Sequence, residues 1–388
     1  MYNIWKLYLI RFFQGFIPAY VIERLFWEQR GMAIQLVIYT EIIYAITILL
    51  LEVPTGILSD RWGRKKMLLV SAFLACFEFL LLLYATQFWH FALVVIFAGV
   101  SNSFLSGTEN AFLYESLQQN KKEHLFEKHL GLLEVCQIVA ALIAALSGSL
   151  LAIYFSLEFN YQISFLSMVA VLWCSFTLQE PIYKQHTEPL PSLFDYVRQS
   201  VFFFRSHTHL FMVVLTGIVI GASLNFVDEF WQLYLSELSI PISHFGLFSA
   251  CCMLLHIPGN LLAPFLQKYY SQTSILLNIQ VIFVIGFTYI ALIHHFTSLL
   301  VIGVIFLASG VVVPIVTGYM HHQIRADMRA TIDSFQSLGQ YVAIMVIGLG
   351  FSYFTKDNDI FGGFGFIGGI CMLYFIYFCF ISWKNSKE

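Results

Sequence analysis

The chain has 388 residues, of which 59% are hydrophobic and 11% are Asp, Glu, Lys or Arg, and its formal net charge is −3. A soluble globular domain carries about 25% charged residues, so this composition excludes an ordinary water-soluble protein. The sequence has no stripe of basic residues, so nothing in it indicates a nucleic-acid partner. The seven cysteines lie in apolar stretches without metal-ligand or disulfide spacing, so we expect no metal site and no cofactor.

Twelve apolar runs follow one another along the chain, and each is long enough to cross a membrane as a helix. A bilayer core about 30 Å thick needs about 20 apolar residues per helix. The runs are apolar nearly throughout, unlike the alternating strands of a membrane barrel. The predicted spans are 5–27, 34–58, 67–87, 90–118, 127–156, 160–178, 207–236, 242–266, 273–294, 298–322, 329–354 and 360–383. The first run lacks a cleavage site, and we expect it to be retained as a span.

Lysine and arginine are distributed unevenly between the two sides that twelve spans define. With the N-terminus inside, the inner segments hold all of these residues except Arg24, Arg30 and Lys356, which are outside, and Arg11, which lies within the first span. Inner loops of membrane proteins carry this positive excess. The pattern therefore predicts that both termini are cytoplasmic.

The longest polar stretch lies at the midpoint of the chain and divides it in two. It predicts an N-terminal six-helix bundle at 1–180, a cytoplasmic linker at 181–206 and a C-terminal six-helix bundle at 207–388. Apolar residues recur at helical spacing within the linker, which favours a short interfacial helix over a structureless connection. Residues 54–64 and 258–268 form a weak repeat that ends the second and the eighth span. Two halves related by pseudo-twofold symmetry explain such a repeat.

The most informative motif is GILSDRWGRKK at residues 56–66, in the predicted inner loop between spans 2 and 3. Gly63 permits a tight turn there, and Asp60 is placed to cap the start of span 3. The motif resembles the signature of the major facilitator superfamily. The longer form EVPTG at 52–56, with SGTE at 106–109 and YESL at 114–117, resembles a bacterial branch of that superfamily.

The resemblance covers essentially the whole chain and implies a fold of twelve membrane helices in a bacterial cytoplasmic membrane. It implies that the loop is a conformational latch between the halves, made by Glu52, Gly56, Asp60, Arg61, Gly63, Arg64 and Glu115. A loop that only determines topology is the alternative. Two family features are missing, because Ser101 and Asn102 stand where many proton-coupled members have an arginine, and 144–148 lacks the Gly-Pro pair of antiporters. Both absences weaken a specific assignment of drug–proton antiport.

Polar residues form stripes on one face of spans 1, 4, 7 and 10, which in the resembled fold line the central cavity. Ionisable groups at such depth are expensive and mark transport pathways or structural pairs. A carboxyl group in an apolar setting is a candidate proton carrier, with a hydrogen-bonded packing role as the alternative. The candidates for substrate binding or proton coupling are Arg11, Gln14, Glu41, Glu78, Asn102, Glu109, Glu134, Asn225, Asp228, Glu229, Trp231, Gln232 and Thr317.

Some of these candidates constrain one another. Arg11 is the only cation that the sequence places deep in a span, and it needs an acidic partner, either Glu109 or Glu134, or an anionic substrate. The adjacent Asp228 and Glu229 cannot both face one cavity. Trp231 is as well explained by core packing as by a cavity.

The leading expectation is a monomeric secondary transporter with the lipid bilayer, a small-molecule substrate and protons as its partners. We expect alternating access and proton-coupled efflux of a small organic or amphipathic solute, with proton-coupled uptake of a sugar, peptide or siderophore as the alternative. An enzyme using His256 or His321 is disfavoured because no catalytic constellation accompanies either residue. A non-transporting sensor is disfavoured by the ionisable groups in the spans.

Overall fold

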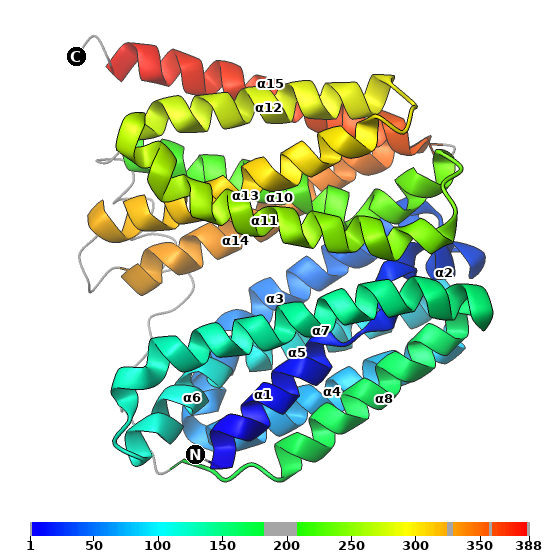
Figure 1. Ribbon diagram of the computed structural model, residues 1–388, viewed down its shortest axis with the longest axis vertical. Helices are drawn as coiled ribbons and strands as arrows, with labels where there is room; N and C mark the ends of the chain where they lie inside the picture. The colour runs from blue at the N-terminus through cyan, green and yellow to red at the C-terminus, as the bar shows by residue number, and fades with distance from the viewer. Residues whose placement is uncertain (1, 182–207, 324–328, 357–358, 386–388) are drawn as a thin grey trace. The chain divides into compact units, whose positions relative to one another are not determined.

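The computed structural model describes residues 2–181, 208–323, 329–356 and 359–385, and within these residues every regular element is a helix (Figure 1). The longer helices are α1 (Tyr2–Gly15), α2 (Glu23–Gln29), α3 (Ile34–Trp62), α4 (Arg64–Tyr84), α5 (Phe88–Leu105), α6 (Thr108–Gln119), α7 (Phe126–Tyr154), α8 (Leu157–Phe176), α10 (Thr208–Glu237), α11 (Phe245–Tyr269), α12 (Gln272–Leu292), α13 (Ser298–Gln323), α14 (Arg329–Phe354) and α15 (Ile360–Asn385). Short 3₁₀ turns are η1 (Pro18–Val21), η2 (Glu123–Leu125) and η3 (Ile242–His244).

Eleven helical stretches of the described chain are long and apolar enough to cross a membrane. They coincide with predicted spans 2 to 12, and most of their ends differ from the predicted ends by no more than about four residues. The first predicted span, 5–27, is not one helix, because α1 stops at Gly15 and is followed by η1 and α2. The fourth, 90–118, is divided into α5 and α6 at residues 106–107. The predicted spans did not include these two interruptions.

The chain groups into two compact units. The first is Met1–Leu190 with Pro241–Ser249, and the second is Pro191–Ile240 with Ala250–Glu388. The predicted linker, 181–206, lies outside the described residues except for Pro181. Its interfacial helix and the proposed bundle boundaries therefore stay predictions.

In the first unit, α1 lies against α7 and α8, and α5 packs on α3 and α4 (Figure 1). Two glycines bring the N-terminal segment close to α7. A Cβ atom on Gly15 would lie 2.5 Å from the carbonyl oxygen of Gln137, and one on Gly148 would lie 2.6 Å from that of Pro18. Small residues at helix crossings allow such close packing where lipid surrounds the bundle.

In the second unit, α12 packs against α13 and α15, and α10 against α13, α14 and α15. Helices α11 and α13 cross at a pair of glycines. A Cβ atom on Gly310 would lie 2.6 Å from the carbonyl oxygen of His256, and one on Gly259 would lie 2.4 Å from that of Leu307. The backbones themselves are in contact at this crossing.

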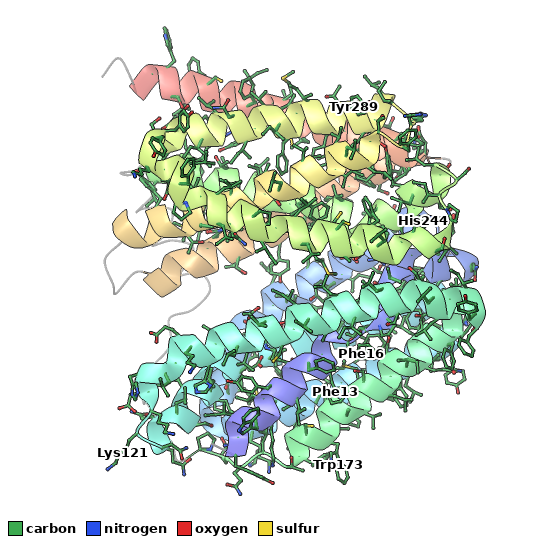
Figure 2. The ribbon with its side chains drawn as sticks, in the orientation of Figure 1. Phe13, Phe16, Lys121, Trp173, His244 and Tyr289 are labelled. Atoms are coloured by element: carbon green, nitrogen blue, oxygen red, sulfur yellow. The ribbon has the colours of Figure 1, made fainter. Side chains whose placement is uncertain are left out.

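Large apolar side chains cover the outside of both units. Trp173 projects outward from α8 (Figure 2) and is 72% exposed. Leu261 on α11 is 74% exposed and Leu300 on α13 is 73% exposed. Exposed apolar bulk on this scale suits hydrocarbon surroundings rather than water.

Candidate functional site

An ion pair in the interior of the first unit joins the first and fourth predicted spans. Arg11 Nε on α1 lies 2.7 Å from Glu109 Oε1 on α6. The Glu109 residue is 2% exposed. Two residues of α7 also contact Arg11. The side-chain oxygen of Gln137 accepts a 2.8 Å hydrogen bond from Arg11 Nη1, and Glu134 Oε1 lies 4.0 Å from Arg11 Nη2. The sequence left Glu109 and Glu134 as alternative partners of Arg11, and the structure places both beside it, Glu109 at the shorter distance.

The helix break beside this pair positions Glu109. Gly107 has φ +70°, a left-handed backbone conformation that glycine adopts at little cost. The backbone restarts as a helix there, with Ala111 N donating to the carbonyl of Gly107. Glu109 consequently sits in the first turn of α6, where the partial positive charge of a helix N-terminus stabilises a carboxylate.

Some buried polar atoms of the first and fourth spans lack a hydrogen-bond partner within the described chain. Gln14 Oε1, Ser103 Oγ and Glu109 Oε2 are all buried, and none has a hydrogen-bond partner there. Buried polar atoms in folded proteins are usually paired. Gln14 lies one turn from Arg11 on the same face of α1, so two of these atoms belong to the site of the ion pair.

The fourth span does not carry the continuous stripe that its spacing predicted. That spacing assumed one helix through Asn102, Ser106 and Glu109, whereas Ser106 lies in the break, between Asn102 on α5 and Glu109 on α6. Asn102 is exposed and donates a 3.2 Å hydrogen bond to Tyr44 OH on α3. It therefore belongs to the contact between α5 and α3.

The predicted latch loop is described in part. The side chains of Glu52, Asp60 and Arg61 and the surroundings of Gly56 lie outside what the structure describes. Gly63 turns the chain between α3 and α4 with φ +94°, as the predicted tight turn requires. A Cβ atom there would lie 3.0 Å from the Glu180 carboxylate, which accepts a hydrogen bond from the backbone of Lys65.

Arg64 ties this loop to α6. Its Nε lies 3.3 Å from Glu115 Oε1, and its Nη1 donates a 2.6 Å hydrogen bond to Ser59 Oγ. Ser59 in turn lies 3.1 Å from Thr108 Oγ1 at the start of α6. Sequence reasoning named Arg64 and Glu115 but missed Ser59, Thr108 and Glu180. The available signals were the positions of Ser59 within the loop motif and of Thr108 within SGTE.

A second buried charge cluster joins α2 to α3. Arg24, which the sequence assigned to an outer segment, is 3% exposed, and its Nη2 lies 3.0 Å from Glu41 Oε1. Its guanidinium also stacks over the ring of Trp27 at 4.7 Å. Arg11 is therefore not the only buried arginine. Glu41 has a structural partner, and Glu78 on α4 is partly buried.

In the second unit, α10 carries five of the candidates. Asp228 is exposed, and Asn225 and Glu229 are partly buried. Trp231 is 7% exposed and Gln232 is 3% exposed. Asp228 and Glu229 thus face different surroundings, as adjacent residues about 100° apart on a helix must.

The remaining candidates of this unit lie on α11 and α13. Thr317 is exposed. His256 packs edge-on against Phe306, with 5.3 Å between ring centroids. The side chain of His321 lies outside the described residues. A search of the described residues finds no group of three side chains that could hold a metal ion.

Comparison with known proteins identifies the class. The sequence pattern of the Major Facilitator Superfamily matches residues 4–348, and the chain belongs to this superfamily of transporters. An uncharacterized transporter of Buchnera aphidicola subsp. Acyrthosiphon pisum is 25% identical over 330 residues, 78% of this chain and 76% of that protein. The multidrug resistance protein MdtG of Salmonella arizonae is 26% identical over 250 residues, 63% of this chain; the match spans 58% of MdtG.

Solved structures show the same fold. The nucleoside transporter NupG superposes with a TM-score of 0.78 at 14% identity, covering 98% of both chains. A D-xylose–proton symporter superposes with a TM-score of 0.71 at 13% identity, covering 97% of this chain and 96% of that one. At these identities the similarity shows the fold alone. The twelve-span fold that the sequence predicted is confirmed, with its first and fourth spans interrupted.

Proposed function

We propose that the chain is a monomeric, proton-coupled efflux transporter for a small organic or amphipathic solute. It works by alternating access in a bacterial cytoplasmic membrane, with both termini in the cytoplasm. The observation that carries this proposal is the ion pair between Arg11 and Glu109, buried where two spans are interrupted. Proton coupling requires an ionisable group whose charge state changes a contact between helices, and this pair is such a group.

The interrupted helices support a binding role for this region. Irregular backbone at membrane depth is tolerated where it is buried in protein or lines a water-filled cavity. Transporters use the N-termini of half-helices at such breaks to contact anionic groups. The break at Gly107 places the start of α6 beside Glu109 and Arg11.

The pair provides a coupling step made from this chain's own residues. While Glu109 is ionised, it holds Arg11 and thus α6 against α1. When Glu109 takes up a proton, the charge attraction is lost, and Arg11 keeps its contacts with Gln137 and Glu134 on α7. Protonation therefore releases α6 from α1 without leaving the guanidinium unpaired.

Efflux is favoured over uptake by the sequence relatives. MdtG is named for multidrug resistance and shares 26% identity over 250 residues. In this proposal, the contact between Arg64 and Glu115 of α6 holds the turn at Gly63 against α6, so that movement of α6 reaches the inner loop.

The test combines a ligand screen with a flux assay. Thermal-shift screening of the purified protein against organic solutes supplies a transported probe, whose flux is then measured in proteoliposomes under an imposed pH gradient. We expect a gradient to drive flux in the wild type. Glu109→Gln should bind the probe and remain folded but lose dependence on the gradient, because its amide cannot exchange a proton.

Glu158→Gln is the matched control. It also removes a carboxylate facing an arginine, Arg30 at 3.5 Å, but Glu158 is 44% exposed at the start of α8. This variant should transport as the wild type does. Gradient-driven flux through Glu109→Gln at the wild-type rate would refute the coupling role. If the probe moved only in the opposite direction, the protein would be an uptake transporter and the proposed efflux would be refuted.

A further inference from the structure

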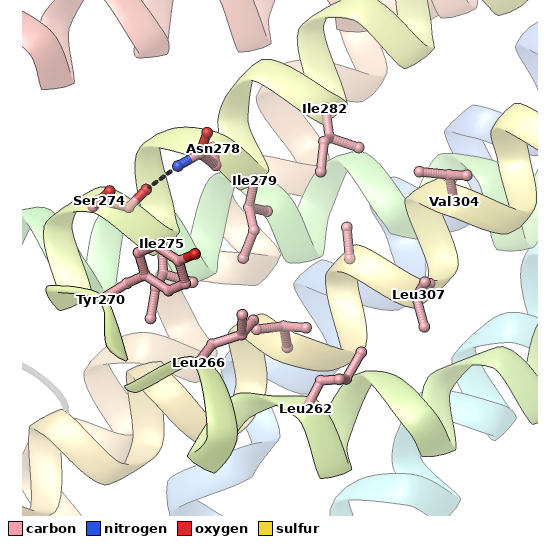
Figure 3. A pocket seen from close by; sticks show the side chains of 12 residues that line it. Leu262, Leu266, Tyr270, Ser274, Ile275, Asn278, Ile279, Ile282, Val304 and Leu307 are labelled. Carbon is pink, nitrogen blue, oxygen red and sulfur yellow. Dashed lines mark hydrogen bonds between the residues drawn. The ribbon is translucent and has the colours of Figure 1, made fainter. Parts of the chain in front are cut away.

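A groove in the second unit runs along three helices, away from the charged candidates. It has a volume of about 280 Å³ and is lined by α11, α12 and α13 (Figure 3). Its lining from α12 runs from Ser274 to Ile282, and its lining from α13 from Val304 to Val311. At 1.5 Å per residue these stretches are about 12 Å and 10 Å long. The groove is therefore elongated along the helix axes.

The polarity of the groove changes along its length. Leu262, Ile282, Val304 and Leu307 line the part near the middle of the spans. The polar lining residues, Tyr270, Ser274 and Asn278, lie toward the end where α11 stops and α12 starts (Figure 3). A hydrocarbon chain with a polar group at one end has this same distribution.

The surroundings of the groove are apolar on the outside and positive at the polar end. Leu261, Phe265 and Leu300, which lie near the groove in the sequence, are 74%, 58% and 73% exposed. Lys268, two residues before Tyr270, lies over the ring of Tyr269 at 5.5 Å. The N-terminus of α12 adds its partial positive charge at the same end. No acidic residue lines the groove.

We propose that this groove binds one acyl chain of an anionic phospholipid, with the headgroup at Lys268 and Tyr270. The positive-inside bias assigns this end of the helices to the cytoplasmic side, so the lipid belongs to the cytoplasmic leaflet. An acyl chain in the groove contacts α11, α12 and α13 together. Binding that favours the folded protein stabilises it. The bound lipid therefore acts as a structural component of the second unit.

Lipid photo-labelling tests this site without any transport measurement. The full chain is reconstituted in nanodiscs of phosphatidylcholine with a trace of phosphatidylglycerol that carries a diazirine on its acyl chain, and labelled peptides are identified by mass spectrometry. We expect label on residues 262–282 and 304–311. Unlabelled phosphatidylglycerol should compete with this label better than phosphatidylcholine does.

Two tryptophan variants of α13 provide the contrast. Val304 is 47% exposed at the edge of the groove, so Val304→Trp fills the groove without entering the core. Excluding about two methylene groups from an apolar site weakens binding roughly tenfold, and labelling should fall accordingly. Leu300→Trp, one turn away on the same helix face and outside the groove, should label as the wild type does. Lys268→Gln should remove the preference for phosphatidylglycerol while acyl labelling persists.

Three results would overturn the proposal. Equal labelling of Val304→Trp and Leu300→Trp would show that the groove is not the site. If unlabelled phosphatidylglycerol and phosphatidylcholine reduced the labelling of the wild type equally, the proposed headgroup contact would be refuted. Displacement of the label by a transported solute, with no difference between the lipids, would assign the groove to substrate instead.

Discussion

The two units connect their helices through different polar contacts. In the first, buried arginines hold carboxylates from other helices, as Arg24 on α2 holds Glu41 on α3 at 3.0 Å. In the described part of the second, hydrogen bonds between neutral groups join helices, as between Thr216 on α10 and Tyr374 on α15 at 2.8 Å. Removing one member of a buried ion pair costs about 3–5 kcal/mol, whereas a neutral hydrogen bond contributes about 1 kcal/mol. Stability in the first unit should therefore depend on a few residues, and in the second on many small contributions.

The largest effect is expected from Arg24→Met. The variant removes the cation that lies 3.0 Å from the Glu41 carboxylate and the contact of the guanidinium with Trp27. We expect the free energy of unfolding to fall by about 3–5 kcal/mol. The measurement is reversible denaturation in detergent micelles, followed by circular dichroism.

Two further variants separate charge from packing. The double variant Arg24→Met with Glu41→Leu should recover part of the lost stability, because Glu41 then carries no charge, although Glu23, 4.0 Å from Arg24, still loses its neighbouring cation. Glu158→Gln removes the carboxylate that faces Arg30, the residue after α2, and should cost about 1 kcal/mol or less, since Glu158 is 44% exposed. The contrast between the units would fail if Glu158→Gln were as damaging as Arg24→Met.

A packing variant of intermediate effect tests whether the second unit has a sensitive point of its own. In Gly310→Ala the new methyl group would meet the carbonyl oxygen of His256 at 2.6 Å and the Cα of Gly259 at 3.1 Å. The backbone cannot move aside as a side chain can, so α11 and α13 must separate, at a cost of about 1–3 kcal/mol.

Gly369→Ala on α15 is the control for this variant. A Cβ atom at Gly369 meets nothing within 4 Å. Alanine in an open helical position should be neutral or should stabilise by up to about 1 kcal/mol. A thermal midpoint for Gly310→Ala no lower than that of Gly369→Ala would show that the α11–α13 crossing adapts freely.

The sequence specified the spans well because each is a long apolar run, and length and composition decide where such a run begins and ends. Predicted span 329–354 coincides with α14, Arg329–Phe354. The sequence also identified Arg11 as a residue that needs an acidic partner, because burying a lone cation is costly at any position in a span. These were inferences from single residues or continuous segments.

Interruptions and pairings were less accessible from the sequence. A glycine inside an apolar run is compatible with an unbroken helix, so Gly107 did not by itself indicate the break that places Glu109 at a helix start. The burial of Arg24 was not predicted because it depends on the contact of α2 with Glu41 on α3. The bond between Arg64 and Ser59 likewise depends on a turn geometry that composition does not encode.

The smallest expected effect comes from a hydroxyl group in the second unit. Tyr374 OH on α15 donates a 2.9 Å hydrogen bond to the carbonyl of Met212 and lies 2.8 Å from Thr216 Oγ1, both on α10. Thr216 also bonds the Met212 carbonyl within its own helix, so it keeps a partner when the phenol hydroxyl is removed. Tyr374→Phe should therefore lower the free energy of unfolding by only about 1 kcal/mol. Tyr377→Phe, one turn along α15 at a side chain 38% exposed, should change it by less than about 0.5 kcal/mol. A loss from Tyr374→Phe as large as that from Arg24→Met would show that a neutral bond in the second unit matters as much as an ion pair in the first.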